Sequence, residues 1–563
     1  MFEKKELPIG IEDFKVLIDN NYYYVDKTKF LCELTRNIGK VNLFTRPRRF
    51  GKTLNLSMIQ RFFEKTDEDN AYLFDGLEVS KAGEAVMAYQ GQYPVIRISM
   101  KGVDAADYRT AFGKFKELVA EEFYRHRELL NSTKISESYK NRFRQICDGE
   151  GDDAVYHTSL KFLSDRLYEE YGKKVIILID EYDVPLEKSH FRGYYNEMID
   201  LIRSLFDSSL KTNESLEMAV LTGCLRVSKE SLFTGLNNLR INSILTKDYS
   251  EYFGFTEQEI ADMTAYYDLD ENATIIKKWY DGYRFGDTEI YNPWSVLNYM
   301  QDARASADTF PMPYWSNTSS NEIIRQLITE SDEDTRDIVE GLVNGDSVTA
   351  AIHEDIVYAD IDVNQESIWS FLLFTGYLKP IASRQMGNFV SYDLVIPNRE
   401  ICSIYQRTIL QWFNDATRLN SRADLLSALL SQDTEQANRI IGTWLNETIS
   451  FYDEKEQYYH GFLAGLLSGI KGYKLESNRE SGNGRPDLIL KERMGSGTAI
   501  IIEVKAADPK KSETLESKLQ EAFTQIGKNH YEEELLNDGY RNIILYGVAF
   551  RKKRCLIEVY KTL

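Results

Sequence analysis

Residues 44–54 read FTRPRRFGKTL and separate an apolar run that ends at Thr45 from a helical pattern that begins at Leu54. A phosphate-binding loop needs this context, because backbone N–H groups at a helix N-terminus cradle phosphates, a lysine reaches the β- and γ-phosphates, and a hydroxyl holds Mg²⁺. The stretch therefore predicts a nucleotide site. Its candidate contacts are Arg48, Arg49, Gly51, Lys52 and Thr53, and Thr53 is also a candidate Mg²⁺ ligand.

A second apolar strand, KVIILIDE over 174–181, ends in two carboxylates. Asp180 is placed to bind the Mg²⁺ of the nucleotide, and Glu181 to polarise the attacking water. A further strand ends in LTG, which puts Thr222 beside the γ-phosphate as a polar sensor. Arg226 follows on the adjoining loop and would stabilise transition-state charge, in cis or from a neighbouring chain; an ordinary surface arginine is the alternative.

The pattern along the chain is a mixed α/β start, a helical middle and a second α/β unit. Near-continuous apolar strands separated by helices predict a parallel sheet covered on both faces. The middle, from about residue 250 to 450, contains an apparent strand pair near 376–378 and 389–392, which is compatible with a helix-plus-wing module. Within it, Asn292 and Pro293 predict a helix start, with Asn292 as N-cap.

The last stretch predicts a further α/β unit with its own core. A helix over 458–467 precedes it, and a Ser-Gly-Asn-Gly turn at 481–484 joins its first two strands as a hairpin. The expected strands are 472–476, 485–490, 498–504, 542–549 and 555–560, with one long helix over 512–536.

This unit carries a candidate metal site. Asp487 opens one strand, and Glu503 and Lys505 lie at the end of the next, 16 positions further on. Alternation along a strand puts Glu503 and Lys505 on one face. Two carboxylates can hold a hard divalent ion, and an adjacent lysine can orient or deprotonate the water that attacks a phosphodiester. The alternative is a solvated strand end with an ion pair.

Further residues could complete this site. A carboxylate from the preceding helix is expected as a metal ligand: Glu456 is the first candidate and Glu480 the alternative, and either could be a surface acid. In the long helix, Gln525 and Tyr531 could face the substrate backbone, and Lys528 could contact phosphate.

The composition limits the class of protein. The 563 residues carry a formal net charge of −20, which repels a polyanion at long range, so nucleic-acid binding needs a local basic surface or a divalent ion. Five widely separated cysteines and six scattered histidines argue against a disulfide framework or a zinc site and leave carboxylates as metal ligands. No apolar run approaches the ~20 residues of a membrane span and the N-terminus lacks a secretory signal, so a cytoplasmic protein without a membrane partner is expected.

With both sites in view, the chain resembles the bacterial AAA-ATPase-like proteins that carry a C-terminal nuclease domain of the PD-(D/E)XK superfamily. The matching stretches are LPIGIEDF, YYYVDKT, RPRRFGKT, IDEYDVP, TGCLRVSKESLFTGLNN, WYDGYRFG, YNPWSVLNY, GRPDLIL and IIEVK. The family's loop also has Arg in place of the first Gly, so Arg46 does not argue against nucleotide binding.

The resemblance implies a multidomain α/β chain. A P-loop NTPase parallel sheet with an extra central strand is expected in 1–250, a helical and winged-helix-like module in 251–424, and a restriction-endonuclease-like α/β domain in 425–563. The implied function is an ATP-regulated nuclease acting on DNA, in defence or DNA processing, with ATP and Mg²⁺ as cofactors and Mn²⁺ as an alternative at the nuclease site. A homo-oligomer stays open. The rival hypothesis is a nucleotide-dependent switch or scaffold that binds nucleic acid or protein without cutting; a DNA-remodelling motor has less support.

Overall fold

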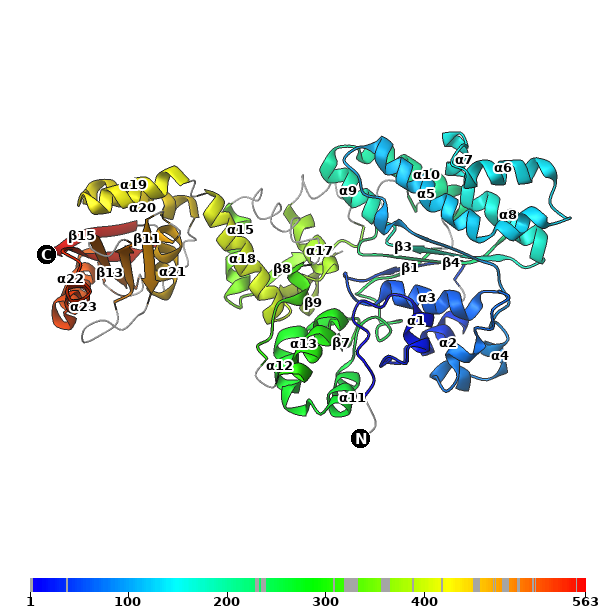
Figure 1. Ribbon diagram of the computed structural model, residues 1–563, viewed down its shortest axis with the longest axis horizontal. Helices are drawn as coiled ribbons and strands as arrows, with labels where there is room; N and C mark the ends of the chain where they lie inside the picture. The colour runs from blue at the N-terminus through cyan, green and yellow to red at the C-terminus, as the bar shows by residue number, and fades with distance from the viewer. Residues whose placement is uncertain are drawn as a thin grey trace. The chain divides into compact units, whose positions relative to one another are not determined.

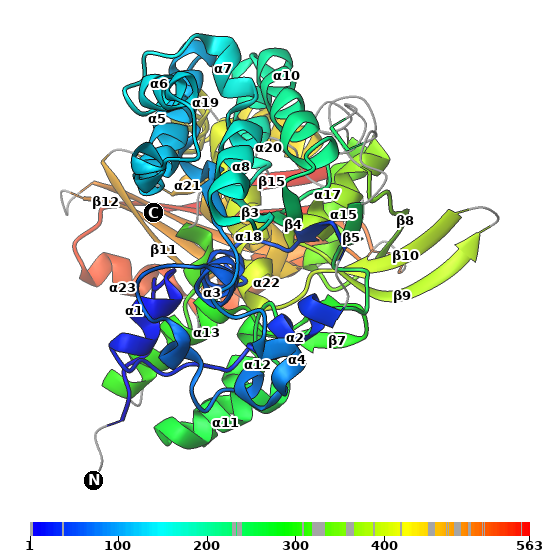
Figure 2. The ribbon, with the colours of Figure 1, turned by 90° about the vertical axis from the view of Figure 1, so that its right-hand side faces the viewer.

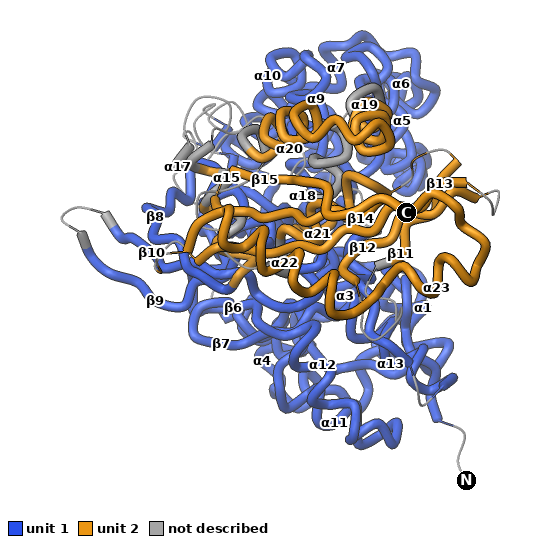
Figure 3. Tube along the Cα trace, turned by 90° about the vertical axis from the view of Figure 1, so that its left-hand side faces the viewer, with its two compact units in different colours: residues 1–319, 345–403 blue, residues 320–344, 404–563 orange. Residues whose placement is uncertain are grey.

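The computed structural model describes most of the chain and divides it into two compact units. Unit 1 comprises residues 1–319 and 345–403, and unit 2 comprises 320–344 and 404–563 (Figure 3). The residues outside the description are 1–3, 37–38, 228–231, 234–238, 307–308, 318–332, 356–364, 387–388, 417–418, 449–455, 469, 471, 478–485, 494–496, 509–510, 512 and 553. The boundaries of the three expected domains stay a prediction.

Unit 1 is built on a five-stranded, wholly parallel sheet in the order β2-β3-β4-β1-β5. Its strands are β1 (Val41–Thr45), β2 (Val95–Ser99), β3 (Val175–Asp180), β4 (Leu216–Gly223) and β5 (Leu239–Asn242). Strand β4 lies between β1, which leads into the basic loop, and β3, which ends in the acidic pair. This confirms the expected extra central strand.

Helices cover both faces of this sheet, because its strands are apolar on both sides (Figures 1 and 2). One face carries α1 (Phe14–Asp19), α2 (Lys29–Arg36) and α3 (Lys52–Phe63); the other carries α5 (Tyr108–Arg125), α8 (Ser159–Tyr171) and α10 (Tyr195–Phe206). The remaining helices of this region are α4 (Glu84–Met87), α6 (Glu137–Cys147), α7 (Asp153–His157) and α9 (Val184–Arg192).

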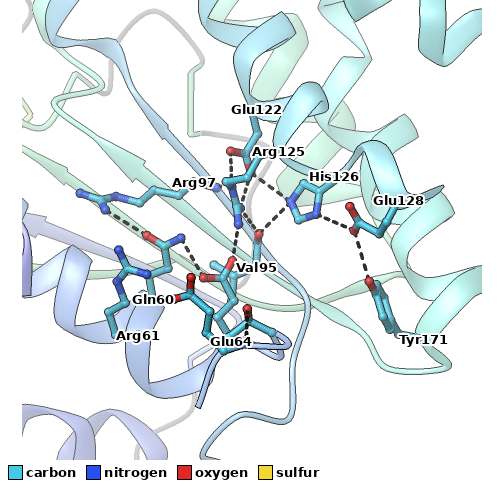
Figure 4. A network of polar contacts seen from close by, with 12 residues as sticks. Gln60, Arg61, Glu64, Val95, Arg97, Glu122, Arg125, His126, Glu128 and Tyr171 are labelled. Carbon is cyan, nitrogen blue, oxygen red and sulfur yellow. Dashed lines mark hydrogen bonds and ion pairs between the residues drawn. The ribbon is translucent and has the colours of Figure 1, made fainter. Parts of the chain in front are cut away.

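A polar network ties α5 to the edge of the sheet (Figure 4). The Arg125 guanidinium donates to Glu64, to the Val95 carbonyl and to Glu122, the last at 2.6 Å. His126 contacts the Val95 carbonyl at 3.1 Å and Glu122 at 3.3 Å. Burial alone would lower the pKa of His126, but its contacts with the neighbouring carboxylates outweigh that effect and raise it.

Three helices and a short hairpin follow the sheet: α11 (Glu257–Tyr267), α12 (Ala273–Tyr280), α13 (Pro293–Ala305), β6 (Tyr283–Phe285) and β7 (Thr288–Ile290). The N-terminal segment packs into their core through Leu7. Lys27 ties the segment to α11, donating to Glu259 at 2.6 Å. Asn292 caps α13, as predicted, by accepting from the next two backbone N–H groups.

The end of unit 1 holds a three-stranded antiparallel sheet, β8-β10-β9, whose β9–β10 hairpin extends from the unit (Figure 2). Its elements are β8 (Val348–Ala351), α17 (Gln365–Thr375), β9 (Lys379–Met386) and β10 (Phe389–Val395). The expected strand pair is present as β9 and β10, but its first strand begins at Lys379 and not at 376–378, because Gly376, with φ +92°, turns the chain after α17. Residues 367–374 of α17 are all buried.

Unit 2 is a mixed five-stranded sheet in sequential order, in which only β13 and β14 pair in parallel. Its strands are β11 (Tyr473–Ser477), β12 (Leu488–Glu492), β13 (Thr498–Ala506), β14 (Asn542–Arg551) and β15 (Arg554–Thr562). The pairing of β11 with β12 matches the predicted hairpin; its turn lies outside the described residues.

Two apolar clusters cover the faces of this sheet. One includes α19 (Leu419–Leu430), α20 (Thr434–Thr448) and α21 (Glu456–Leu467), and the other α22 (Leu515–Asn529) and α23 (Glu532–Asn537). The prediction of one long helix is wrong, because His530 takes the left-handed conformation, with φ +47°, and ends α22. Two further helices lie earlier in the chain, α15 (Glu333–Val343) and α18 (Arg399–Ala416). Within the described ranges, every helix is too short or too polar to cross a bilayer.

Candidate functional site

The carboxyl ends of β3 and β4 meet the start of α3 at one buried carboxylate. Asp180, which is fully buried, accepts a hydrogen bond from the Thr53 hydroxyl at 2.7 Å on one oxygen. Its other oxygen accepts from the Thr222 hydroxyl at 2.5 Å. The structure thus brings together three predicted site residues that lie up to 169 positions apart, 53 to 222, in the sequence. A carboxylate beside a hydroxyl fits the oxygen-rich shell that Mg²⁺ prefers.

The loop before α3 has the backbone geometry of an anion cradle. Gly51 has φ +80° and directly precedes the helix, whose first N–H groups have no partner within the helix. Lys52 is buried, and its ammonium donates to the carbonyls of Arg46 and Pro47 at 2.9 Å each. The lysine therefore lies across the inside of the loop, where phosphate oxygens could replace these carbonyls as acceptors.

Arg46 explains why the loop begins without the usual glycine. Its side chain is fully buried and donates to the carbonyls of Thr45 at 2.8 Å and Asn242 at 2.7 Å. The guanidinium also lies 5.0 Å from the Phe253 ring and 5.1 Å from the Phe285 ring. Burial lowers its pKa to about 9. Arg46 therefore joins β1 to β5 and points away from the cradle.

Arg48 and Arg49 are each engaged by another element. Arg48 donates to the buried carboxylate of Glu187, on α9, at 2.6 Å. The Arg49 guanidinium lies 4.4 Å from the Trp294 ring at the start of α13. Sequence reasoning missed both partners, although Trp294 belongs to the YNPWS stretch. Both arginines line the pocket described below.

Glu181 occupies a strained position at the end of β3. Its φ is +50°, a conformation rare for a residue with a side chain. Its backbone N–H donates to the Thr222 hydroxyl at 3.4 Å. Burial raises the pKa of the Glu181 carboxyl, the charges of Asp180 and Asp183 raise it further, and Lys52 opposes them. A carboxyl with a raised pKa suits a general base.

Two residues that were not predicted from the sequence hold the segment after β4. Asp183 accepts from the backbone N–H groups of Cys224 at 2.7 Å and Leu225 at 3.0 Å. The Tyr182 hydroxyl donates to the Leu225 carbonyl at 2.6 Å. Both belong to the IDEYDVP stretch, which was the available signal. They position the backbone next to Arg226, whose side chain is half-buried and is not part of the pocket lining.

A pocket of about 450 Å³ adjoins the loop. One part is polar and includes residues 48–53 and Glu181. The other part is mainly apolar and includes Ile11, Val25, Phe255, Met263 and Leu297. A charged part beside an apolar part, at this volume, fits a nucleotide with its phosphates on the loop and its base on the apolar side chains.

The candidate metal site of unit 2 lies where β12 and β13 pair. Their antiparallel pairing ends with Leu488 opposite Ile502, so Asp487 directly precedes the last pair on one strand and Glu503 directly follows it on the other. Asp487 accepts from the Val504 backbone N–H at 2.8 Å, which fixes its carboxylate over β13.

Lys505 is buried and donates to Glu503 at 3.1 Å. Ile501, on the same face of β13 as Glu503 and Lys505, packs in the cluster of α22 and α23, whereas Val504 packs in the opposite cluster. The structure thus gathers Asp487, Glu503 and Lys505 on one face of the sheet.

Neighbouring residues support this face. Gln525 and Asn529 of α22 donate to the buried Tyr531 hydroxyl at 3.3 Å and 2.8 Å. Burial raises the pKa of Tyr531, and the charges of Glu503 and Asp487 add to that effect. His460, on α21, contacts the Asp487 carbonyl at 2.9 Å and was missed from the sequence, where it had no paired ligand to mark it.

The remaining predicted members of this site are Lys528, Glu456 and Glu480. Lys528 is exposed. Helix α21 begins at Glu456, but the side chain of Glu456 and all of Glu480 lie outside the described residues. Among the described side chains, no group of three or more His, Cys, Asp or Glu residues could hold a metal ion. Asp487 and Glu503 supply two of the oxygen ligands that a hard divalent cation needs.

Two parts of the chain match known families. Residues 8–233 match the family described as predicted AAA-ATPase, and residues 454–560 match the PD-(D/E)XK nuclease superfamily. The chain is also 28% identical over 438 residues, 76% of its own length and 75% of the relative's, to the "Uncharacterized protein in vnfD 5'region" of Azotobacter chroococcum mcd 1. The two family matches include the basic loop with Asp180 and the face with Asp487. The chain therefore combines an AAA-ATPase-like segment, 8–233, with a segment of the PD-(D/E)XK nuclease superfamily, 454–560.

Proposed function

We propose that this protein is an ATP-regulated, Mg²⁺-dependent DNA nuclease. The observation that carries the proposal is the presence of both sets of reactive groups in one chain: Asp180 with its two threonine donors, and Asp487, held by the Val504 N–H, with the Glu503–Lys505 pair. Defence against foreign DNA or DNA processing, in the cytoplasm, is the use we propose. The three segments 1–250, 251–424 and 425–563 are its proposed domains.

The first proposed reaction is ATP hydrolysis. Lys52 and the first N–H groups of α3 bind the phosphates, and Thr53 with Asp180 would hold Mg²⁺, which neutralises phosphate charge when bound. Glu181 orients and polarises the attacking water from its raised-pKa carboxyl. Thr222 supports both acids through its single hydroxyl. Arg226 is the proposed stabiliser of transition-state charge, in cis or from a second copy of the chain.

The second proposed reaction is phosphodiester hydrolysis. Asp487 and Glu503 would hold the divalent ion, Mg²⁺ or Mn²⁺, which acts there as a Lewis acid on the phosphate. Lys505, held against Glu503, orients the attacking water or takes its proton. Glu456, at the first position of α21, is the proposed third carboxylate ligand.

One assay tests this function against the scaffold alternative. The purified protein is incubated with linear, supercoiled and single-stranded DNA and with RNA, with Mg²⁺ or Mn²⁺, and with or without ATP. We expect metal-dependent cleavage of DNA whose rate changes with ATP. Nucleic-acid binding without cleavage under every condition would establish the scaffold instead, and cleavage of RNA alone would replace DNA as the substrate.

A further inference from the structure

The basic loop is contacted by several elements of the region that follows the sheet. Each residue from 47 to 50 touches a different downstream element: Pro47 meets Gly376, the Arg48 carbonyl accepts from Trp315, Arg49 lies over Trp294 and Phe50 packs on Tyr283. A loop that only bound phosphate would need no such contacts, since its backbone does that work.

The contact at Gly376 is especially close. A Cβ built on Gly376 would lie 2.9 Å from the Cβ of Pro47, and its φ of +92° also favours glycine. The turn after α17 therefore rests directly on the loop. A displacement of Pro47 toward this turn would move the turn, because the space between them is too small for one added carbon atom.

A buried carboxylate joins these contacts behind the loop. Glu400 has no exposed surface; it accepts from the Ser295 hydroxyl at 2.8 and 2.9 Å and from the Trp315 backbone N–H at 2.9 Å. The Trp315 indole N–H donates to the Arg48 carbonyl at 3.4 Å, and Ser295 follows Trp294, which stacks on Arg49. Glu400 therefore holds the backbone of Trp315 directly, and holds the residue next to Trp294 through the Ser295 hydroxyl.

Glu400 also lies at the start of the helix that leads out of unit 1. Helix α18 begins at Arg399 and ends at Ala416. Unit 1 includes residues up to 403 and unit 2 resumes at 404, so one helix belongs to both. A change in how Glu400 is held therefore acts on the first turn of that helix.

We propose that Glu400 is a positioning residue that transmits nucleotide occupancy of the loop to α18, and through it regulates the nuclease unit. This inference rests on the proposed function. The switching element is Lys52: it donates to the carbonyls of Arg46 and Pro47, and phosphate draws it away from them. The loop backbone then relaxes at Pro47 and Arg48, which are the residues that Gly376 and Trp315 contact. Coupling arises because Lys52 has two alternative sets of partners.

The test uses the full chain and three variants, Glu400→Ala, Glu400→Gln and Ser295→Ala. Two quantities are measured: the ratio of DNA cleavage rates with and without ATP, and the hydrogen exchange of amides 399–407 with and without ATP. In wild type we expect ATP to change the cleavage rate roughly 5- to 150-fold, the usual range of allosteric coupling, and to change the exchange. In Glu400→Ala we expect a ratio near one and no exchange response, with the ATP Kd unchanged, whereas Glu400→Gln, whose amide oxygen can still accept from Ser295 and Trp315, should keep both responses. Ser295→Ala should reduce both responses partially.

Glu122→Gln is the matched control, because Glu122 is also a buried carboxylate of unit 1 but belongs to the network on α5 (Figure 4). It should lower the Tm while keeping both ATP responses, which separates coupling from stability. Full ATP responses in Glu400→Ala and Ser295→Ala would overturn the inference, as would a loss of response in Glu122→Gln equal to theirs. If wild type shows the exchange response but cuts no nucleic acid, the nuclease proposal fails and the link from loop to α18 stands. If wild type cuts DNA at a rate that ATP leaves unchanged, the regulation itself fails.

Discussion

Thr222 donates its hydroxyl proton to Asp180 at 2.5 Å and accepts, with the same oxygen, the backbone N–H of Glu181 at 3.4 Å. One hydroxyl therefore sets the position of both acids at the end of β3. We expect Thr222→Val, which keeps the shape but removes the hydroxyl, to lower kcat for ATP by about tenfold or more while changing ATP affinity little. Thr222→Ser, which retains the hydroxyl, is the control. Equal kcat for Thr222→Val and wild type would show that the threonine only fills space.

Variants of Lys52 and Glu181 should separate ATP binding from ATP hydrolysis. Lys52→Ala removes the only side-chain cation that lies across the inside of the described loop, so ATP affinity should fall by about two orders of magnitude. Glu181→Gln removes the base and should lower kcat by about 10²- to 10⁴-fold with the Kd preserved. Calorimetry and steady-state hydrolysis measure the two effects. Unchanged hydrolysis in Glu181→Gln would exclude Glu181 from the mechanism.

A further prediction concerns the sheet face with Asp487, Glu503 and Lys505, and it distinguishes the two proposed metal ligands from the lysine. Asp487→Ala and Glu503→Ala should abolish cleavage and weaken Mn²⁺ binding, whereas Lys505→Ala should abolish cleavage and retain the ion. ATP hydrolysis should continue in all three. Glu558→Ala, which removes an exposed carboxylate of β15, is the control and should cut at the wild-type rate. Wild-type cutting by Glu503→Ala would place the nuclease site elsewhere.

The sequence pattern predicted the features that follow from where each strand and helix begins and ends. A strand that ends in Asp180 and a helix that begins at Lys52 put both at the same edge of a parallel sheet, so their proximity follows from the fold class. The partners of the loop could not be predicted this way, because Glu400 is 352 positions beyond Arg48 (400 − 48) and no spacing rule links them. The end of α22 at His530 was not predicted for another reason. His530 adopts the left-handed conformation, but histidine is not a residue type that marks the end of a helix in a sequence.

Glu400 predicts a pH dependence of stability. Burial raises the pKa of its carboxyl from 4.5 to about 7, against the opposing bonds from Trp315 and Ser295. Between these values the folded protein holds a proton that the unfolded chain has lost, so this stability is present below pH 4.5 and is lost as the pH rises through about 7. Glu400→Gln has no such loss. Its unfolding free energy relative to wild type should therefore rise by about 2–3 kcal/mol from pH 5 to pH 8. A difference that stays constant with pH would contradict the burial of this charge.

Arg46 makes the last prediction, at the position where phosphate-binding loops usually begin with glycine. Restoring that residue with Arg46→Gly should destabilise the protein, because the carbonyls of Thr45 and Asn242 lose their buried donor and a cavity opens between Phe253 and Phe285. The expected cost is about 3–5 kcal/mol, the range for removing one partner from a buried, charged arrangement. ATP affinity should not improve, since the arginine does not face the cradle. Arg46→Lys keeps the charge but not the planar fork, so its Tm should lie between those of wild type and Arg46→Gly. Thermal unfolding and ATP calorimetry on the three proteins decide the matter: tighter ATP binding at unchanged Tm in Arg46→Gly would mean that Arg46 obstructs the phosphate site instead of supporting the sheet beneath it.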